Sequence, residues 1–210
     1  MRIDSISAQP DRVGRYRIGF DDGSTMRLYK QTVQDFGLYT GLELDDNAME
    51  ALRTAAGAMS AKMRAVRIVS ASSVSKGDLQ QRLVQKGEDP EQAREAVQWM
   101  ADLDLLDDRK TAQQVVQRCI SKGYGLARAK QALYEKRIPK SYWQEALADY
   151  PDQTDAILSF LRSRLGDSWD ARDLRRATDA LLRRGHSYSE IRRCLEELPG
   201  CDDFTEDSYG

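Results

Sequence analysis

Leu83-x-x-Lys86-Gly87, Leu133-x-x-Lys136-Arg137 and Leu181-x-x-Arg184-Gly185 are three copies of one pattern, and they decide the fold. The leucines lie 50 and then 48 residues apart. In each copy the residue 14 positions after the leucine is apolar, and a residue that caps helix N-termini well stands eight positions before it. These capping residues are Ser75, Gly125 and Asp173. A shared start, end and apolar phase indicates an internal repeat of stacked helical units.

Apolar periodicity and capping signals predict three helices in each repeat. The expected helices span 48–69, 75–87 and 89–103, then 108–121, 125–136 and 139–148, then 152–165, 173–184 and 187–198. Ser75 with Asp78, and Ser187 with Glu190, have the spacing of a capping box. Because a unit of about 50 residues buries little core alone, neighbouring repeats are expected to stack into an elongated, curved rod.

The N-terminal part of the chain follows a different pattern. Residues 3–29 alternate between apolar and polar, and Asp21-Asp22-Gly23-Ser24 is a strong hairpin loop. A small antiparallel β element of two or three strands is therefore expected to pack against the helices. The predicted fold is mainly α, with a β element over 1–44, repeats over 45–106, 107–150 and 151–199, and an acidic disordered tail over 200–210.

Charge is segregated along the chain, although the net charge is only −2. Residues 61–87 carry a net charge of +5, residues 88–108 carry −7, residues 117–147 carry +5 and residues 172–193 carry +4. Alternating blocks predict separate basic and acidic faces. No apolar run approaches the roughly 20 residues of a membrane-spanning helix, and the N-terminus lacks a signal-peptide core, so we expect a cytoplasmic protein without membrane contact.

Candidates for catalysis or metal binding are few. The three cysteines, Cys119, Cys194 and Cys201, are widely separated and are interpreted as free thiols. His186 is the single histidine, and we interpret it as a solvated turn residue or one lying over a helix end. No phosphate-binding glycine loop or cluster of zinc ligands is present in the sequence. We therefore expect a protein that is not an enzyme and has no catalytic residues, cofactor or metal.

The basic segments are the better functional lead. In residues 173–184, Leu174, Ala177 and Leu181 converge on one helical face. Arg172, Arg176 and Arg183 form a stripe on the opposite face, interrupted by Asp179. A solvated face that keeps the protein soluble is the alternative interpretation. Arginine suits phosphate and carboxylate partners because its planar fork donates two hydrogen bonds at once. The tryptophans Trp99, Trp143 and Trp169 are expected in the core rather than as stacking platforms for bases.

The repeats resemble the RecX family of regulatory proteins. The resemblance rests on Leu106-Asp107-Asp108, on Lys122-Gly123-Tyr124-Gly125, and on the Leu-x-x-Lys/Arg-Gly helix ends, and it covers about residues 3–198. The chain departs from the family at Arg137, where glycine is usual, and at Thr111, where an aromatic residue commonly follows the acidic pair. The order of motifs is also similar to that of longer family members, with a β element before three three-helix units.

The resemblance implies a monomeric modulator that binds the filament of RecA recombinase on DNA, in the filament groove. Such a protein inhibits strand exchange, ATP hydrolysis and coprotease action, and it touches single- or double-stranded DNA weakly or within the filament. Two alternatives stay open: a stand-alone DNA-binding helical-repeat protein, which the near-zero net charge disfavours, and a general helical scaffold for other proteins. The residues expected to contact the filament or DNA are Lys76, Arg82, Lys86, Arg128, Lys130, Lys136, Arg137, Lys140, Arg172, Arg176, Arg183 and Arg184.

Overall fold

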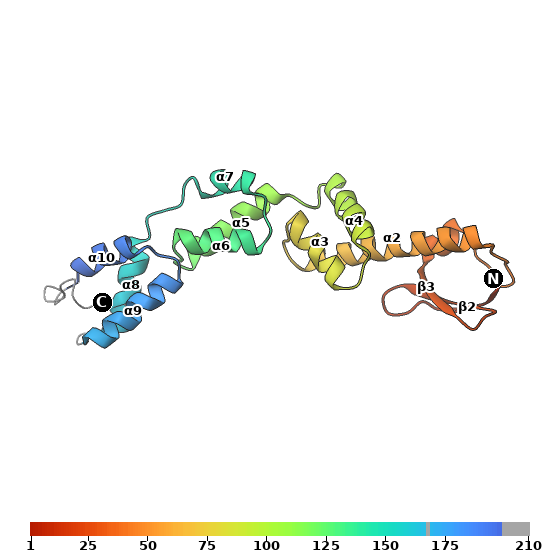
Figure 1. Cartoon of the computed structure of the whole chain (residues 1–210), viewed down its shortest axis with the longest axis horizontal. Coiled ribbons are helices and arrows are strands. Elements are labelled where there is room, and N and C mark those ends of the chain that lie inside the picture. The colour runs from red at the N-terminus through yellow and green to blue at the C-terminus, as the bar shows by residue number, and fades with distance from the viewer. Residues whose placement is uncertain (167–168, 199–210) are drawn as a thin grey trace. The chain divides into compact units, whose positions relative to one another are not determined.

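The computed structural model describes residues 1–166 and 169–198 (Figure 1). The chain divides into two compact units, Met1–Asp107 and Asp108–Gly210, called unit 1 and unit 2 below. The expected acidic tail, from residue 200, lies outside the described residues. The fold is mainly helical with a small N-terminal sheet, as the sequence predicts.

Unit 1 begins with a three-stranded antiparallel sheet, which confirms the predicted β element. Its strands are β1 (Ile3–Ile6), β2 (Arg15–Phe20) and β3 (Thr25–Tyr29), in the order β1-β2-β3. The predicted loop closes the β2–β3 hairpin, with Gly23 at a φ of 82° that favours glycine. A short helix, α1 (Lys30–Asp35), follows β3 directly and was not predicted. Six residues are too few to display a helical period in the sequence.

Helix α2 (Asp46–Ala71) takes part in two cores (Figure 1). Its first half buries Met49 and Leu52 together with Ile18 and Leu28 of the sheet. Its second half packs with α3 (Lys76–Gln85) and α4 (Pro90–Asp102), around Leu83 and other buried apolar residues. The marginal sheet is thereby attached to the first helical repeat through one continuous helix, as expected for an element that is not stable alone.

Unit 2 contains the helices of the second and third predicted repeats, each set around a core of its own. The first set is α5 (Asp108–Ser121), α6 (Leu126–Glu135), a 3₁₀ turn η1 (Lys140–Tyr142) and α7 (Trp143–Leu147). The second set is α8 (Thr154–Leu165), α9 (Ala171–Arg183) and α10 (Tyr188–Glu196). Leu133 and Leu181, the repeat leucines, are fully buried in these two cores.

In unit 2 the predicted start of α9 is wrong, and the helix predicted over 139–148 begins with a 3₁₀ turn. Asp173 does not cap its helix: Asp170 is the N-cap and accepts a hydrogen bond from the Asp173 N–H at 2.8 Å, so the N-cap lies three residues earlier than expected. The helix predicted over 139–148 is present over 140–147 without a gap. Its first turn is the tighter 3₁₀ helix η1, in which the Tyr142 N–H donates to the Pro139 carbonyl at 3.1 Å. The Ser187–Glu190 capping box is confirmed.

The repeated sequence pattern is a repeated helix end. In all three copies the residue after the Lys or Arg has a positive φ: 90° at Gly87, 52° at Arg137 and 87° at Gly185. The next backbone N–H donates to the carbonyl of the repeat leucine, at 3.1 Å from Glu88, 3.1 Å from Ile138 and 3.2 Å from His186. The N–H of the positive-φ residue donates three residues back, to Val84, Tyr134 and Leu182. This pair of bonds is the Schellman motif, which satisfies carbonyls that a helix end leaves unpaired.

The second and third repeats interlock through their backbones. The Gly125 N–H donates to the Arg184 carbonyl at 3.0 Å, and the Ala127 N–H donates to the Gly185 carbonyl at 3.2 Å. A Cβ built on Gly125 would lie 2.1 Å from the Gly185 oxygen, so only glycine fits there. His186 is buried at this junction, with Nε2 3.0 Å from the Gly123 carbonyl. Of the two interpretations of His186, the solvated turn residue is therefore wrong, and the ring instead lies against Gly123, two residues after the end of α5.

The charge state of His186 follows from its surroundings. Burial lowers the pKa of the imidazole below its ordinary value, so the neutral ring is favoured at pH 7. A carbonyl only accepts hydrogen bonds, so Nε2 carries the proton. Nδ1 is buried without a hydrogen-bond partner among the described residues. Protonation of Nδ1 would bury a charge, so this contact is weakened as the pH falls below the unfolded-state imidazole pKa.

We expect the substitution Leu133→Ala to lower the free energy of unfolding by about 2–5 kcal/mol, because it leaves a cavity in a fully buried site. The neighbouring Tyr134, 67% exposed, supplies the control: Tyr134→Ala should shift stability by no more than about 0.5 kcal/mol. Urea denaturation of the three proteins measures both effects. A wild-type midpoint for Leu133→Ala would show that the repeat register is wrong.

Gly125→Ala should destabilise unit 2 by about 1–3 kcal/mol through overpacking. Gly125 has φ −77° and ψ 166°, which alanine adopts without strain, so the effect isolates the steric contact with the Gly185 backbone. Lys130→Ala, an exposed change in the same helix, is the control. Thermal unfolding followed by circular dichroism compares the two, and equal stability of Gly125→Ala and wild type would contradict the interlock.

Candidate nucleic-acid interface

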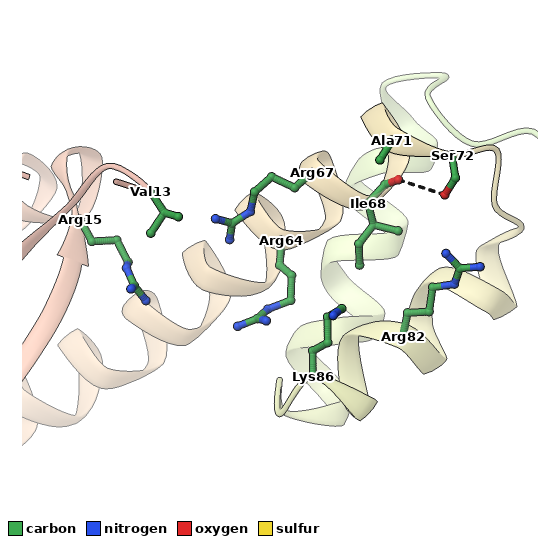
Figure 2. Close-up of a pocket in the computed structure, with 9 residues that line it drawn as sticks. All are labelled: Val13, Arg15, Arg64, Arg67, Ile68, Ala71, Ser72, Arg82 and Lys86. Atoms are coloured by element: carbon green, nitrogen blue, oxygen red, sulfur yellow. Dashed lines mark hydrogen bonds between the residues drawn. The ribbon is translucent and has the colours of Figure 1, made fainter. Parts of the chain in front are cut away.

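A basic concavity of about 510 Å³ lies in unit 1, and we call it the unit-1 concavity (Figure 2). Three parts of the unit contribute to it: the start of β2 with the turn before it, the second half of α2, and α3. The lining residues are Val13, Arg15, Arg64, Arg67, Ile68, Ala71, Ser72, Arg82 and Lys86. Five of these nine side chains are cationic and none is acidic, so the surface suits an anion.

Three of the five cations are held by carboxylates. Arg15 pairs with Asp11 at 2.9 Å, and Arg82 pairs with Asp78 one helical turn away at 2.9 Å. Arg64 pairs with Glu88, which also accepts a hydrogen bond from the Ser60 hydroxyl at 3.0 Å. Each pair restricts the rotamers of an arginine that lines the unit-1 concavity. Such restriction lowers the entropy that binding a ligand would remove.

Glu88 reaches Arg64 because of the helix end that precedes it. Glu88 is the residue after Gly87, and the positive φ of Gly87 turns the chain back so that the Glu88 side chain is buried. Arg64 and Arg67 are three residues apart on α2 and therefore lie on one side of that helix. The repeated helix end thus supplies the turn, and Glu88, which is particular to the first repeat, supplies the carboxylate that positions Arg64.

The site residues predicted in unit 1 are only partly brought together. Arg82 and Lys86 line the unit-1 concavity, whereas Lys76, the first residue of α3, does not. Sequence reasoning missed Arg15, Arg64 and Arg67. Arg64 and Arg67 carry a recognisable signal, since two arginines one turn apart share a helix face. Arg15 carries none, because only the tertiary fold brings the start of β2 beside α2.

The arginine stripe on α9 is exposed, as the periodicity predicts. Leu174, Ala177 and Leu181 are buried in the core of the third repeat, while Arg172, Arg176 and Arg183 face solvent. A second concavity of about 310 Å³ lies here, lined by Arg164, Asp173, Arg176, Ala177, Ala180 and Arg183. Asp173 is 3.9 Å from Arg176, which reduces the local positive charge. Arg164 was not among the predicted site residues.

The remaining predicted residues have varied surroundings. Arg128 pairs with Glu135 at 3.0 Å, and Lys130 and Lys140 are exposed. Lys136 is half-buried at the end of α6, and Arg137 is exposed in the positive-φ turn that follows. Arg184 is half-buried, with its guanidinium carbon 4.7 Å from the Phe160 ring centre and 5.9 Å from that of Tyr124. This packing gives Arg184 a role between the second and third repeats.

The other chemically notable side chains are structural. Trp99, Trp143 and Trp169 are partly buried against three different cores, as predicted. Burial raises the pKa of the Cys119 and Cys194 thiols, which disfavours their reactive thiolate form. Cys201 lies outside the described residues. Residues 1–166 and 169–198 contain no group of three or more His, Cys, Asp or Glu placed to hold a metal ion.

Helix length and apolar character also bear on membrane insertion. Among the helices that the structure describes, in residues 1–166 and 169–198, none is both long enough and apolar enough to span a membrane.

Known proteins share both sequence and fold with this chain. Residues 107–147 match a family model described as RecX, second three-helix domain. Regulatory protein RecX of Xanthomonas campestris pv. campestris (strain B100) is 32% identical over 121 residues, which cover 56% of this chain and 75% of that protein. Regulatory protein RecX of Clostridioides difficile (strain 630) is 24% identical over 208 residues, covering 96% of this chain and 98% of that protein.

Two solved structures have a similar fold. A crystal structure of regulatory protein RecX has a TM-score of 0.63 at 23% identity and covers 93% of this chain and 98% of that one. RecX from Lactobacillus salivarius has a TM-score of 0.57 at 21% identity, covering 69% and 97% respectively. These two likenesses show the fold. Together with the sequence match to the Xanthomonas protein and the repeated three-helix pattern, they lead to one conclusion: the chain belongs to the RecX family of regulatory proteins.

Proposed function

We propose that this protein is a negative modulator of the RecA recombinase. In this proposal it binds the RecA–DNA filament in its groove and lowers ATP hydrolysis, strand exchange and coprotease action. Membership of a family of regulatory proteins carries the proposal. RecA as the regulated partner comes from the resemblance of the repeats to that family. The protein would act in the cytoplasm, as a monomer, without a cofactor.

The surface chemistry supports this function. A filament presents both DNA phosphate and protein, and a partner with separate basic and acidic blocks is suited to both. Basic side chains are exposed in both units, in the unit-1 concavity and on α9. The acidic residues that are described serve mainly in caps and ion pairs, including Asp45, Asp89 and Asp170 at helix starts. The site is therefore that of a binding protein, and we propose that the chain is not an enzyme.

A substoichiometric amount of this protein should slow ATP hydrolysis by RecA on single-stranded DNA. The reason is that a protein lying in the filament groove resists the changes between subunits that accompany turnover. Phosphate release measured over a titration, with folded protein, gives the result. An unchanged rate at all ratios would favour the scaffold interpretation, and ATP hydrolysis by this protein alone would contradict the non-enzyme proposal.

The α9 stripe has its own test. Replacing Arg172, Arg176 and Arg183 together with alanine should change folding stability by no more than about 0.5 kcal/mol per site, because all three are exposed. Removing one arginine–phosphate interaction should reduce the slope of log affinity against log salt by about 0.7–0.9 for filament binding. A folded triple variant with wild-type affinity and salt slope would identify the stripe as a solvated face.

A stand-alone DNA-binding function is the second candidate, and the unit-1 concavity favours it. Five cations gathered in one open surface are placed to contact phosphates even though the net charge of the chain is near zero. Comparing the affinity for bare DNA with that for RecA-coated DNA across a salt series separates the two functions. Equal affinities for bare and RecA-coated DNA would favour the stand-alone role. Tighter binding to coated DNA would favour the modulator function.

A further inference from the structure

The unit-1 concavity carries more positive charge than the carboxylates paired with its arginines neutralise. Arg15, Arg64 and Arg82 are paired with acids, as described above. Arg67 is exposed and its Nη2 donates to the Tyr29 hydroxyl at 3.3 Å, a neutral partner. Lys86 is exposed as well, and neither Arg67 nor Lys86 has a carboxylate partner within the described residues. Two cations are therefore left to face an external anion.

The paired arginines keep further donors available. Arg64 uses Nε for Glu88, so its Nη groups remain for another acceptor. Arg82 uses Nε and Nη2 for Asp78, which leaves Nη1. The carboxylates hold both guanidinium groups in place, and both arginines line the concavity that Arg67 and Lys86 also line. The site is thus organised before a ligand arrives.

The arrangement of donors favours a tetrahedral oxyanion over a carboxylate. A carboxylate is planar and is best bound by one arginine fork in its own plane. Here the cations come from three different elements around one concavity, with Arg15 on the β2 side, Arg64 and Arg67 on α2, and Arg82 and Lys86 on α3 (Figure 2). A phosphate has oxygens pointing in several directions, which suits donors that surround it.

The shape of the surface favours a polymer over a small molecule. Its volume is typical of small-ligand sites, but it is open to solvent rather than enclosed. Val13, Ile68 and Ala71 add apolar surface to the lining, and an open groove lets a chain enter and leave at its edges. Two uncompensated cations match two backbone phosphates, each of which carries a single negative charge.

We propose that the unit-1 concavity binds consecutive phosphates of a nucleic-acid backbone, with Arg67 and Lys86 as the principal contacts. Arg15, Arg64 and Arg82 donate the additional hydrogen bonds. This inference rests on the proposed function for the source of the nucleic acid, which is the DNA of the filament, but binding at the concavity itself does not require RecA. It also gives the N-terminal sheet a part in recognition, because Arg15 belongs to β2.

The test is binding of a fluorescein-labelled single strand of about 20 nucleotides to the full chain, measured by fluorescence anisotropy across a salt series. The double variant Arg67→Gln/Lys86→Gln should reduce the slope of log affinity against log salt by about 1.4. When salt is lowered from about 1 M to about 0.1 M, the affinity of the wild-type protein should therefore rise roughly 25-fold more than that of the double variant. Circular dichroism and thermal unfolding check that the variant folds.

Arg53→Gln/Lys30→Gln is the matched control. It removes the same charge from the same unit at two exposed positions outside the concavity, and should leave the salt slope within about 0.3 of wild type. An equal loss in both double variants would show that only net charge matters and would overturn the proposed site. Competition by polyglutamate as effective as that by unlabelled strand would assign it to acidic polypeptide. Competition by a free nucleoside triphosphate at equal phosphate concentration would assign it to free nucleotides.

The RecA assay separates this inference from the proposed function. If the double variant binds the bare strand like wild type while the wild-type protein slows RecA, the concavity assignment fails and the modulator function stands. If the double variant loses strand binding while wild-type protein leaves RecA turnover unchanged, the phosphate site stands and the modulator function fails.

Discussion

The structure depends on one backbone constraint, the left-handed turn that ends the middle helix of every repeat. The turn makes the next residue leave the helix towards the interior, so Glu88, Ile138 and His186 are all at most 8% exposed. The backbone bonds of the turn are the same in the three copies, but the residue after the turn is not. The side chain after the turn is therefore free to differ, and it makes a different contact in each repeat. Glu88 pairs with Arg64 of α2, Ile138 packs in the core of its own repeat, and His186 contacts the preceding repeat.

Because the backbone turn is shared and the side chain after it varies, the same helix end makes different contacts in different repeats. In unit 1 the inward residue is Glu88, and its pairing with Arg64 fixes one guanidinium of the unit-1 concavity. In the third repeat the same position holds His186, which contacts Gly123 and contributes to stacking instead. The same helix end thus fixes an arginine of the unit-1 concavity in one unit and joins two repeats in the other.

Most of the architecture could be predicted, because the repeat leucines, caps and glycines are local signals. The register of Leu83, Leu133 and Leu181 follows from periodicity alone, and each is buried. The errors arise where a competing local bond or a distant contact decides the outcome. Asp170 and Asp173 are both good caps, and sequence does not show which one starts α9. Arg15 joins α2 through folding of the sheet, and His186 is buried by another repeat, so neither has a local signature.

The residue eight positions before the repeat leucine shows how the stacking of repeats changes which residue type is favoured at a helix start. The first repeat has Ser75 there, whose hydroxyl caps its helix, while the second has Gly125, which offers no side-chain bond. Serine is the better cap in isolation. At Gly125, however, any Cβ would collide with the Gly185 backbone, and two inter-repeat hydrogen bonds replace the missing cap. The second repeat thus lacks an independent side-chain cap, and the N–H groups of Gly125 and Ala127 find these carbonyl partners only when the two repeats are stacked.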